Sequence, residues 1–518
     1  MRRTEMTFRI EKKYITVPVN TAASVKNLAI KIDGKTVYDM DCKIDPRNPN
    51  FTAYIDVSRF TGAIVEVKSD PKLDFEIGFA DAIPDEYEEY RPKIHFTVRN
   101  GWNNDPNGLI YYGGKYHMFY QYNPCSGEWG TMHWGHAVSD DLIHWEEKDI
   151  ALYPDELGAM YSGSAVEDVK GVSGISNGKN PPMLMYYTAA AGSATRMSSG
   201  KRHTQCLAYS FDGETFTKYD GNPIIPHIEG GNRDPKVVWV EELGKYLLAL
   251  YLNENRYCFF VSDDLVNWKH YQDIPIPSDW ECPDIYPLNC DGERLWVLMG
   301  ARDYYLVGRF SENGFVPIGS EKHLSCAGVN YAAQSFSGTG ERVIRVYWQR
   351  TKFPTPRVTQ QMSIPVEMSL VKEDGEYFLK ALPVNELFAE SEVLYEAEKL
   401  MMNAPVTVQM PEKPIYIELG ADYDAFARLI LTVFGKKISV DMRSGEIWIE
   451  KTRIPLSLKK EKLDVRLVID RCTAEIYADG GRYLMAENFV CDYNLPYIKL
   501  EAVNGSPEIE KIKIYSLS

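Results

Sequence analysis

Three acidic residues stand in settings that could support catalysis. Asp105 lies in the stretch Trp-Asn-Asn-Asp-Pro-Asn-Gly, Asp234 lies in Gly-Gly-Asn-Arg-Asp-Pro-Lys, and Glu281 lies between a tryptophan and a cysteine. Taken singly, each has a plainer interpretation. Asn, Asp, Pro and Gly favour turns, so either aspartate can be a turn former. Glu281 can be an ordinary residue at a strand end, with Asp284 as its local rival.

Together, the three carboxylates match what the hydrolysis of a glycosidic bond requires. One carboxyl group attacks the anomeric carbon or activates water, and a second group with a raised pKa protonates the leaving oxygen. Arg233 is expected to hold the neighbouring carboxylate of Asp234 ionised. Apolar neighbours are expected to raise the pKa of Glu281 towards a general-acid role.

A short internal repeat indicates how these residues could be brought together. The sequence Ser-Asp-Asp-Leu-Ile-His-Trp at 139–145 recurs as Ser-Asp-Asp-Leu-Val-Asn-Trp at 262–268, with a weaker copy at 210–216. Each copy falls between two predicted strands, and units of about 50 residues are typical of propeller blades. The sequence therefore predicts a five-bladed β-propeller over residues 91–380, which would gather acidic residues from different blades at one end of its axis.

The fold class is predicted to be all-β, because strand patterns dominate and long helical periodicity is nearly absent. Residues 1–90 and 385–518 alternate in the manner of half-buried strands, which indicates a small N-terminal β-sandwich-like domain and a C-terminal β-sandwich domain. The pairs Asp33-Gly34 and Gly113-Gly114 predict hairpin turns.

Composition limits the classes of partner. The 518 residues carry a formal charge of −16, which disfavours nucleic acid and anionic membranes and suits a small neutral substrate. The first residues have no apolar segment of the kind found in signal peptides. The nine cysteines are scattered, as expected of free thiols in a reducing compartment. A cytoplasmic location is therefore predicted.

The three acidic blocks together resemble those of glycoside hydrolase family 32, the invertases, inulinases and levanases. Further matching blocks are Phe-Tyr-Gln-Tyr-Asn-Pro at 119–124, Trp-Gly-Thr-Met-His-Trp-Gly-His-Ala at 129–137 and Tyr-Ser-Gly-Ser-Ala at 161–165. The resemblance covers roughly residues 90–510 and implies a five-bladed propeller followed by a β-sandwich. It also implies a β-fructofuranosidase that needs no cofactor and no metal.

The resemblance implies a role for each matching residue. Asp105 would be the nucleophile of a retaining, double-displacement mechanism, Glu281 the acid and base, and Asp234 the stabiliser of the transition state. A retaining mechanism requires about 5–5.5 Å between the nucleophile and the acid. The expected substrate-binding residues are Asn104, Gln121, Trp129, Ser162 and Arg233, with Trp102, Tyr161 and Trp348 as apolar walls.

Several functions remain open at this point. The leading hypothesis is an exo-acting hydrolase that releases fructose from sucrose, fructo-oligosaccharides or fructans. The alternatives are a fructosyltransferase with the same triad, an inverting five-bladed arabinan or xylan hydrolase, and an inactive sugar-binding protein. A homo-oligomer is also possible.

Other motifs favour plainer interpretations. His133 and His136 are spaced like metal ligands but lack a third ligand, and Cys282 lacks a histidine partner and is expected to pack near the acid. Residues 192–200 lack the lysine of a phosphate-binding loop and are expected to form a loop at the rim of the site.

Overall fold

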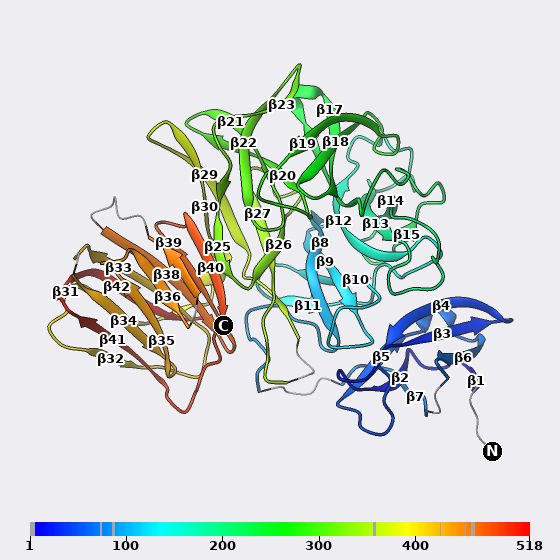
Figure 1. Cartoon of the computed structure of the whole chain (residues 1–518), viewed down its shortest axis with the longest axis horizontal. Coiled ribbons are helices and arrows are strands. Elements are labelled where there is room, and N and C mark those ends of the chain that lie inside the picture. The colour runs from blue at the N-terminus through cyan, green and yellow to red at the C-terminus, as the bar shows by residue number, and fades with distance from the viewer. Residues whose placement is uncertain are drawn as a thin grey trace.

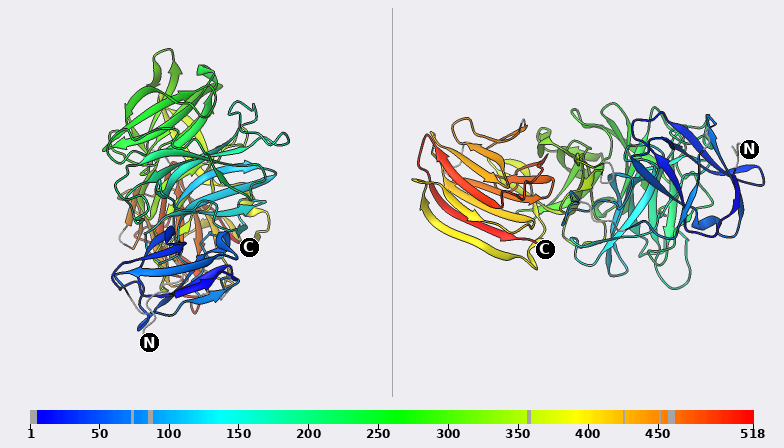
Figure 2. Two further views of the ribbon diagram at one scale, coloured as in Figure 1. Left: turned by 90° about the vertical axis from the view of Figure 1, so that its right-hand side faces the viewer. Right: turned by 90° about the horizontal axis from the view of Figure 1, so that it is seen from below.

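The computed structural model describes residues 6–72, 75–84, 89–355, 359–424, 426–450, 452–456 and 462–518. The described residues form strands and three short 3₁₀ helices, η1 (Ser58–Phe60), η2 (Glu241–Leu243) and η3 (Asn385–Phe388). The prediction of an all-β chain is confirmed. The N-terminal and C-terminal strands lie at opposite ends of a larger middle region (Figures 1 and 2). Among the described residues, no helix has the length and apolar character needed to cross a membrane.

The N-terminal strands form two antiparallel sheets, in the orders β1-β6-β3-β4 and β5-β2-β7. Their inward-facing residues alternate with exposed ones and share one apolar core. The turn at Asp33-Gly34 joins paired residues Ile32 and Lys35, as predicted. The strands are β1 (Met6–Arg9), β2 (Tyr14–Val19), β3 (Lys26–Ile32), β4 (Lys35–Cys42), β5 (Phe51–Asp56), β6 (Ile64–Asp70) and β7 (Gly78–Ala80).

The described strands between residues 102 and 383, apart from β25, form five antiparallel sheets that follow one another along the chain. The first sheet contains β8 (Trp102–Tyr112), β9 (Lys115–Asn123), β10 (His133–Ser139) and β11 (Trp145–Glu147). The second contains β12 (Ala159–Glu167), β13 (Met183–Ala190), β14 (Thr204–Ser210) and β15 (Thr217–Lys218). The third contains β16 (Arg233–Val240), β17 (Lys245–Asn253), β18 (Arg256–Ser262) and β19 (Lys269–Pro275).

The fourth sheet contains β20 (Asp284–Cys290), β21 (Glu293–Met299), β22 (Tyr304–Ser311), β23 (Gly314–Pro317) and β24 (Lys322–His323). The fifth contains β26 (Asn330–Ser335), β27 (Ile344–Gln349), β28 (Gln361–Met362), β29 (Val366–Glu373) and β30 (Glu376–Pro383). The first strands of the five sheets touch in turn: β8 contacts β12, β12 contacts β16, β16 contacts β20, β20 contacts β26, and β26 contacts β8. Residues on these five strands therefore face a common centre.

The three copies of the sequence repeat form the same turn between the third and fourth strands of their sheets. In each copy the aspartate two residues after the serine caps the turn, and Asp141, Asp212 and Asp264 each accept two backbone N–H groups. The next residue has a positive φ in every copy, 71° at Leu142 and 64° at Leu265. The predicted position of the repeat between two strands is confirmed.

The C-terminal strands form two further sheets that enclose a single apolar core. Their orders are β25-β40-β39-β38-β33-β42-β31 and β32-β41-β34-β35-β36-β37. Strand β25 comes from the middle region and pairs in parallel with β40, which joins the two regions. The bounds are β25 (Ser325–Gly328), β31 (Glu392–Met401), β32 (Val406–Gln409), β33 (Ile415–Asp422), β34 (Arg428–Val433), β35 (Lys436–Asp441), β36 (Glu446–Ile449), β37 (Thr452–Pro455), β38 (Lys462–Asp470), β39 (Thr473–Ala478), β40 (Tyr483–Asn488), β41 (Tyr497–Val503) and β42 (Glu508–Ser516).

A buried histidine links the middle region to the C-terminal sheets. His95 Nδ1 lies 3.0 Å from Asp470, and His95 Nε2 lies 3.2 Å from Glu475. Burial alone lowers the pKa of a histidine, but the hydrogen bonds to Asp470 and Glu475 outweigh it and raise the pKa of His95 to about 9. The imidazolium therefore neutralises carboxylates that have no access to water.

Replacing His95 by Gln is expected to lower the free energy of unfolding by about 3–5 kcal/mol at pH 6, because two buried carboxylates lose their cation. The folded-state pKa is above the unfolded value of 6.5, so this stability is fully present below pH 6.5 and is lost as the pH rises through about 9. Urea unfolding of both proteins at about pH 6 and pH 10 checks this.

The matched control is His144→Gln, because His144 makes an exposed pair with Asp141. That variant should lose less than about 1 kcal/mol at either pH. An equal loss for His95→Gln at both pH values would contradict the assigned ion pair.

Candidate active site

The first strands of four sheets are irregular at the predicted site residues. The pairing register shifts between Asn104 and Pro106 on β8, between Tyr161 and Gly163 on β12, between Arg233 and Lys236 on β16, and between Tyr331 and Gln334 on β26. A bulge leaves a residue unpaired and re-aims its side chain, and it accommodates a proline that cannot donate to the ladder. The two Asp-Pro pairs therefore place Asp105 and Asp234 in bulges that turn them towards the centre.

Asp105 is held by donors from two strands. Its Oδ2 accepts the hydroxyl of Ser162 over 2.7 Å, and its Oδ1 accepts the amide of Asn104 over 3.1 Å. Burial raises the pKa of Asp105, and these two hydrogen bonds act against that rise. The carboxylate is thus fixed in one orientation while it remains poorly solvated.

Asp234 is almost fully buried and has a left-handed backbone, with φ of 65°. Its Oδ2 accepts the backbone N–H of Cys282 over 3.1 Å. Burial raises the pKa of Asp234 to about 7, although Arg233 acts to lower it. Arg233 does pair with this carboxylate, with Nε 3.6 Å from Asp234, but burial has the larger effect on the pKa, so the expectation that Arg233 alone keeps Asp234 ionised is not met.

Glu281 takes the closer contact with the guanidinium. Nη2 of Arg233 donates to its Oε1 over 2.7 Å, and the hydroxyl of Tyr331 donates to its Oε2 over 2.8 Å. The carboxylate therefore lies among polar groups, and the expectation of an apolar environment from its chain neighbours was wrong. The indole N–H of Trp280 donates to the same hydroxyl of Tyr331 over 2.9 Å.

Cys282 connects the three carboxylates. Its Sγ lies 3.5 Å from Oδ2 of Asp234 and 3.7 Å from Oδ2 of Asp105, and it directly follows Glu281 in the chain. Burial and both aspartates raise the pKa of this thiol, so it stays protonated and donates. The prediction that it packs near the acid is refined: the thiol lies against the two aspartates.

The predicted aromatic walls lie on two sides of this cluster. Trp102 and Trp348 pack edge to face at 6.0 Å, and the indole N–H of Trp102 donates to Asn104 over 2.8 Å. On the other side, Trp129 and Tyr161 pack at 6.2 Å. Half of Trp129 is exposed, which places it at the mouth of the site.

The structure supports Gln121 as a substrate-binding residue less directly than it supports the other predicted residues. It lies on β9 opposite Asn104, and its amide donates to the carbonyl of Met160 over 2.8 Å. Its side chain is buried, so this backbone group holds its amide in place. Sequence reasoning did not single out Tyr331, because its bond to Glu281 joins residues 50 positions apart.

Comparison with known proteins identifies the family. The profile described as "Glycosyl hydrolases family 32 N-terminal domain" matches residues 95–381, more than half of the chain. The chain belongs to glycoside hydrolase family 32. It is therefore a glycoside hydrolase, as the sequence predicted.

Relatives in family 32 extend the match beyond the profile. The levanase of Bacillus subtilis is 30% identical over 501 residues, which cover 85% of this chain and 72% of the levanase. The extracellular exo-inulinase of Aspergillus awamori is 33% identical over 335 residues, which cover 55% of this chain and 62% of the inulinase.

Solved family 32 structures share the fold. The crystal structure of the Aspergillus awamori exo-inulinase has a TM-score of 0.73 and 25% identity, and covers 83% of this chain and 99% of its own. A Schwanniomyces occidentalis fructofuranosidase complexed with fructose gives the same score and identity, with 83% of this chain and 98% of its own covered.

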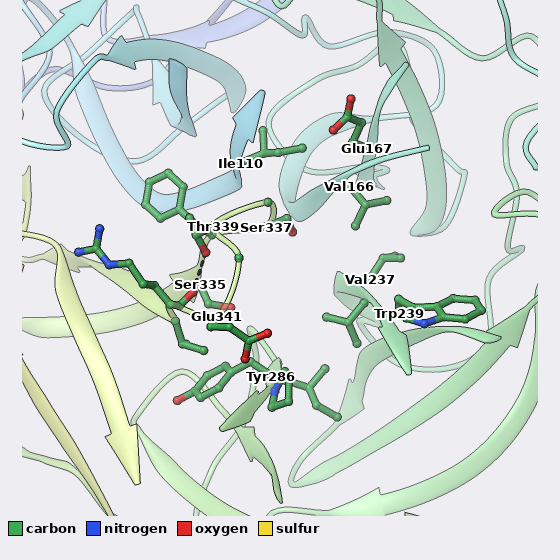
Figure 3. Close-up of a pocket in the computed structure, with 18 of the residues that line it drawn as sticks. Ile110, Val166, Glu167, Val237, Trp239, Tyr286, Ser335, Ser337, Thr339 and Glu341 are labelled. Carbon is green, nitrogen blue, oxygen red and sulfur yellow. Dashed lines mark hydrogen bonds between the residues drawn. The ribbon is translucent and has the colours of Figure 1, made fainter. Parts of the chain in front are cut away.

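A separate cavity of about 450 Å³ lies at the other ends of the same strands (Figure 3). It is lined by Ile110, Val166 and Val237, which follow Asp105, Ser162 and Asp234 along β8, β12 and β16. Lys236, whose Nζ lies 3.1 Å from Asp284, also lines this cavity. This cavity is therefore distinct from the carboxylate cluster of this family 32 chain.

Replacing Asp234 by Asn is expected to stabilise the protein at neutral and higher pH. The folded-state pKa of about 7 exceeds the unfolded value of 3.8, so the contribution of this carboxyl group to stability is fully present below about pH 4 and is lost as the pH rises to about 7. Asparagine cannot ionise, so the gain over the wild type should grow to a few kcal/mol, at most about 4, near pH 8. Urea unfolding across this range measures it.

Asp212→Asn serves as a control of opposite sign, because backbone N–H groups of Thr215 and Glu214 outweigh burial and lower the pKa of Asp212. That variant should lose stability as the pH rises through about 4. A stability difference for Asp234→Asn that does not change with pH would contradict the assigned burial.

Proposed function

We propose that the chain is a retaining, exo-acting β-fructofuranosidase, which releases terminal β-D-fructosyl units from sucrose, fructo-oligosaccharides or fructans. One observation carries the proposal: Asp105, Asp234 and Glu281 converge around Cys282 in a chain of family 32. The names of its relatives, a levanase and exo-inulinases, support a fructoside as the substrate.

In the proposed first step, Asp105 attacks the anomeric carbon of the fructosyl unit. The bond from that carbon to the leaving oxygen breaks, and Glu281 gives its proton to that oxygen. In the second step, Glu281 takes a proton from water, the water oxygen bonds to the anomeric carbon, and Asp105 leaves. The hydrogen bonds from Ser162 and Asn104 support this role, because they fix the attacking carboxylate.

Arg233 and Tyr331 support the proposed acid and base role of Glu281, because they bind one carboxyl oxygen each. A general acid must be held within reach of the leaving oxygen throughout the reaction. Asp234 would not form a covalent bond. It would bind fructose hydroxyls and, when ionised, stabilise the oxocarbenium-like transition state.

The proposal includes the architecture and the cellular setting. The cyclic contacts of the five first strands support a five-bladed propeller at 91–380, between an N-terminal β-domain at 1–90 and a C-terminal β-sandwich at 385–518. The separation of about 5–5.5 Å between nucleophile and acid stays a prediction. A cytoplasmic location and a possible homo-oligomer stay predictions as well.

The product profile of the purified protein tests the proposal. Sucrose, a short β-2,1 oligomer, inulin and levan are each incubated with the protein, and free fructose is followed with time. Release of fructose from at least one of them is expected. No release from any, by protein shown to be folded, would refute the proposal. Growth of longer fructosyl products at high sucrose would favour a transferase instead.

A further inference from the structure

Strand β4 of the N-terminal region lies against segments on one side of the active site. The hydroxyl of Tyr38 lies 2.5 Å from Nε2 of His133, and the backbone N–H of Asp41 donates to Oγ1 of Thr131 over 2.9 Å. That hydroxyl in turn donates to the carbonyl of Ala194. One N-terminal strand thus reaches both the segment before β10 and the loop after β13.

Asp39 binds the loop after β13 through both of its carboxylate oxygens. Its Oδ1 accepts the hydroxyl of Thr195 over 2.5 Å, and its Oδ2 accepts the backbone N–H of Arg196 over 2.7 Å. A third donor, the amide of Asn27, comes from the neighbouring strand over 2.9 Å. Asp39 is 1% exposed and Thr195 is 4% exposed, so water cannot replace the two donors from the loop.

The loop at residues 192–200 adopts a conformation that needs such support. Ala194 has φ of 54°, in the left-handed region that residues other than glycine rarely occupy. The hydroxyl of Ser198 is buried and accepts the backbone N–H of Gly192 over 3.0 Å, which closes the loop on itself. A strained backbone of this kind persists only where its surroundings hold it.

The same loop contacts the active site through Ser193. Its hydroxyl lies 2.7 Å from the hydroxyl of Tyr161, which packs against Trp129 at the mouth of the site. Tyr161 directly precedes Ser162, the residue that donates to Asp105. A continuous series of contacts therefore runs from β4 through the loop to the residue beside the proposed nucleophile.

We propose that Asp39 is a positioning residue for the active site. Through Thr195 and Arg196 it fixes the loop so that Ser193 holds Tyr161 against the bound substrate. The N-terminal region is thereby part of the substrate-binding unit, although Asp39 itself does not reach the substrate. The inference rests on the proposed function, because it takes Tyr161 to border the bound fructoside.

Asp39→Asn is the direct test, because it places an amide donor opposite the donors of the loop. KM for a short fructo-oligosaccharide is expected to rise about tenfold, with kcat within about twofold of the wild type, since the loop orders binding and takes no part in bond breaking. In the Tyr161→Phe background, which already lacks the bond to Ser193, the same change should raise KM no further.

A second readout does not depend on activity. In Asp39→Asn, the backbone amides of residues 192–200 should exchange hydrogen faster than in the wild type. If Asp39→Asn does not fold, Thr195→Val removes only one hydroxyl and should shift both readouts in the same direction. Asp56→Asn is the matched control: this buried aspartate of the same region caps the turn at Ser58, and its change should leave KM unaltered.

The proposal is overturned if Asp39→Asn leaves KM within twofold of the wild type, if the two substitutions act additively, or if exchange in the loop is unchanged. A wild-type protein that releases no fructose would refute the proposed function alone. In that case the exchange measurement still decides whether Asp39 fixes the loop.

Discussion

Replacing Asp105 by Asn is expected to lower kcat on sucrose or a short fructo-oligosaccharide by roughly 10⁴- to 10⁶-fold, because removing a covalent nucleophile has an effect of that order. Asparagine fills the same space and can still accept the hydroxyl of Ser162. The fold should survive, and because burial raises the pKa of Asp105, the variant should be at least as stable as the wild type near pH 7. Steady-state kinetics and thermal unfolding measure the two effects.

Asp141→Asn is the matched control for this substitution. Asp141 caps a turn at the far end of the same sheet by accepting the backbone N–H groups of Ile143 and His144. The variant should keep the activity of the wild type. If Asp105→Asn retained more than about 1% of wild-type activity after purification from any wild-type protein, Asp105 could not be the nucleophile.

Replacing Glu281 by Gln is expected to lower kcat on sucrose by roughly 10²- to 10⁴-fold, because the leaving oxygen loses its proton donor. The loss should depend on the leaving group. Fructosyl fluoride needs little protonation, so its first step should be slowed far less than that of sucrose. Comparing the two substrates by pre-steady-state kinetics separates an acid from a residue that merely binds.

Tyr331→Phe is an informative companion to that experiment. It keeps Glu281 but removes the hydroxyl that donates to Oε2. The expected loss of kcat on sucrose is smaller than that of Glu281→Gln, because the bond from Arg233 to Oε1 remains. If Glu281→Gln lost the same fraction of its activity on sucrose and on fructosyl fluoride, Glu281 could not be the general acid.

Local features of the fold could be read from the sequence because short-range hydrogen bonds produce them. The Ser-Asp-Asp repeat predicted a recurring position between strands, and the structure places one capped turn there in three sheets. The Asn-Asp-Pro and Arg-Asp-Pro stretches were expected to favour turns, but they lie inside strands β8 and β16, where proline cannot donate within the ladder. The structure has bulges at both.

The charge interactions within the site could not be predicted from the sequence. The neighbour of Asp234 in the chain, Arg233, makes its closer bond with Glu281, which lies 48 positions away. Backbone conformation decides this, since Asp234, Glu281 and Cys282 all have positive φ values. Such strained conformations cluster at functional sites and leave no periodic signal in the sequence.

The contact between β4 and the loop at residues 192–200 was also beyond sequence reasoning. Asp39 and Thr195 lie 156 positions apart, and neither is part of a recognisable motif. Only the packing of the N-terminal sheet against the first two sheets of the middle region brings them together. The sequence did indicate that the loop lies at the rim, and the bond from Ser193 to Tyr161 supports that prediction.

Trapping the covalent intermediate shows whether Asp105 is the nucleophile. Protein mixed with fructosyl fluoride is quenched in acid within milliseconds, digested and analysed by peptide mass spectrometry, with Glu281→Gln included because its second step should be slow. One fructosyl unit is expected on Asp105, in the peptide that contains residues 102–108. A fructosyl unit on another residue would contradict it, as would the absence of any adduct together with an inverted anomer as the first product.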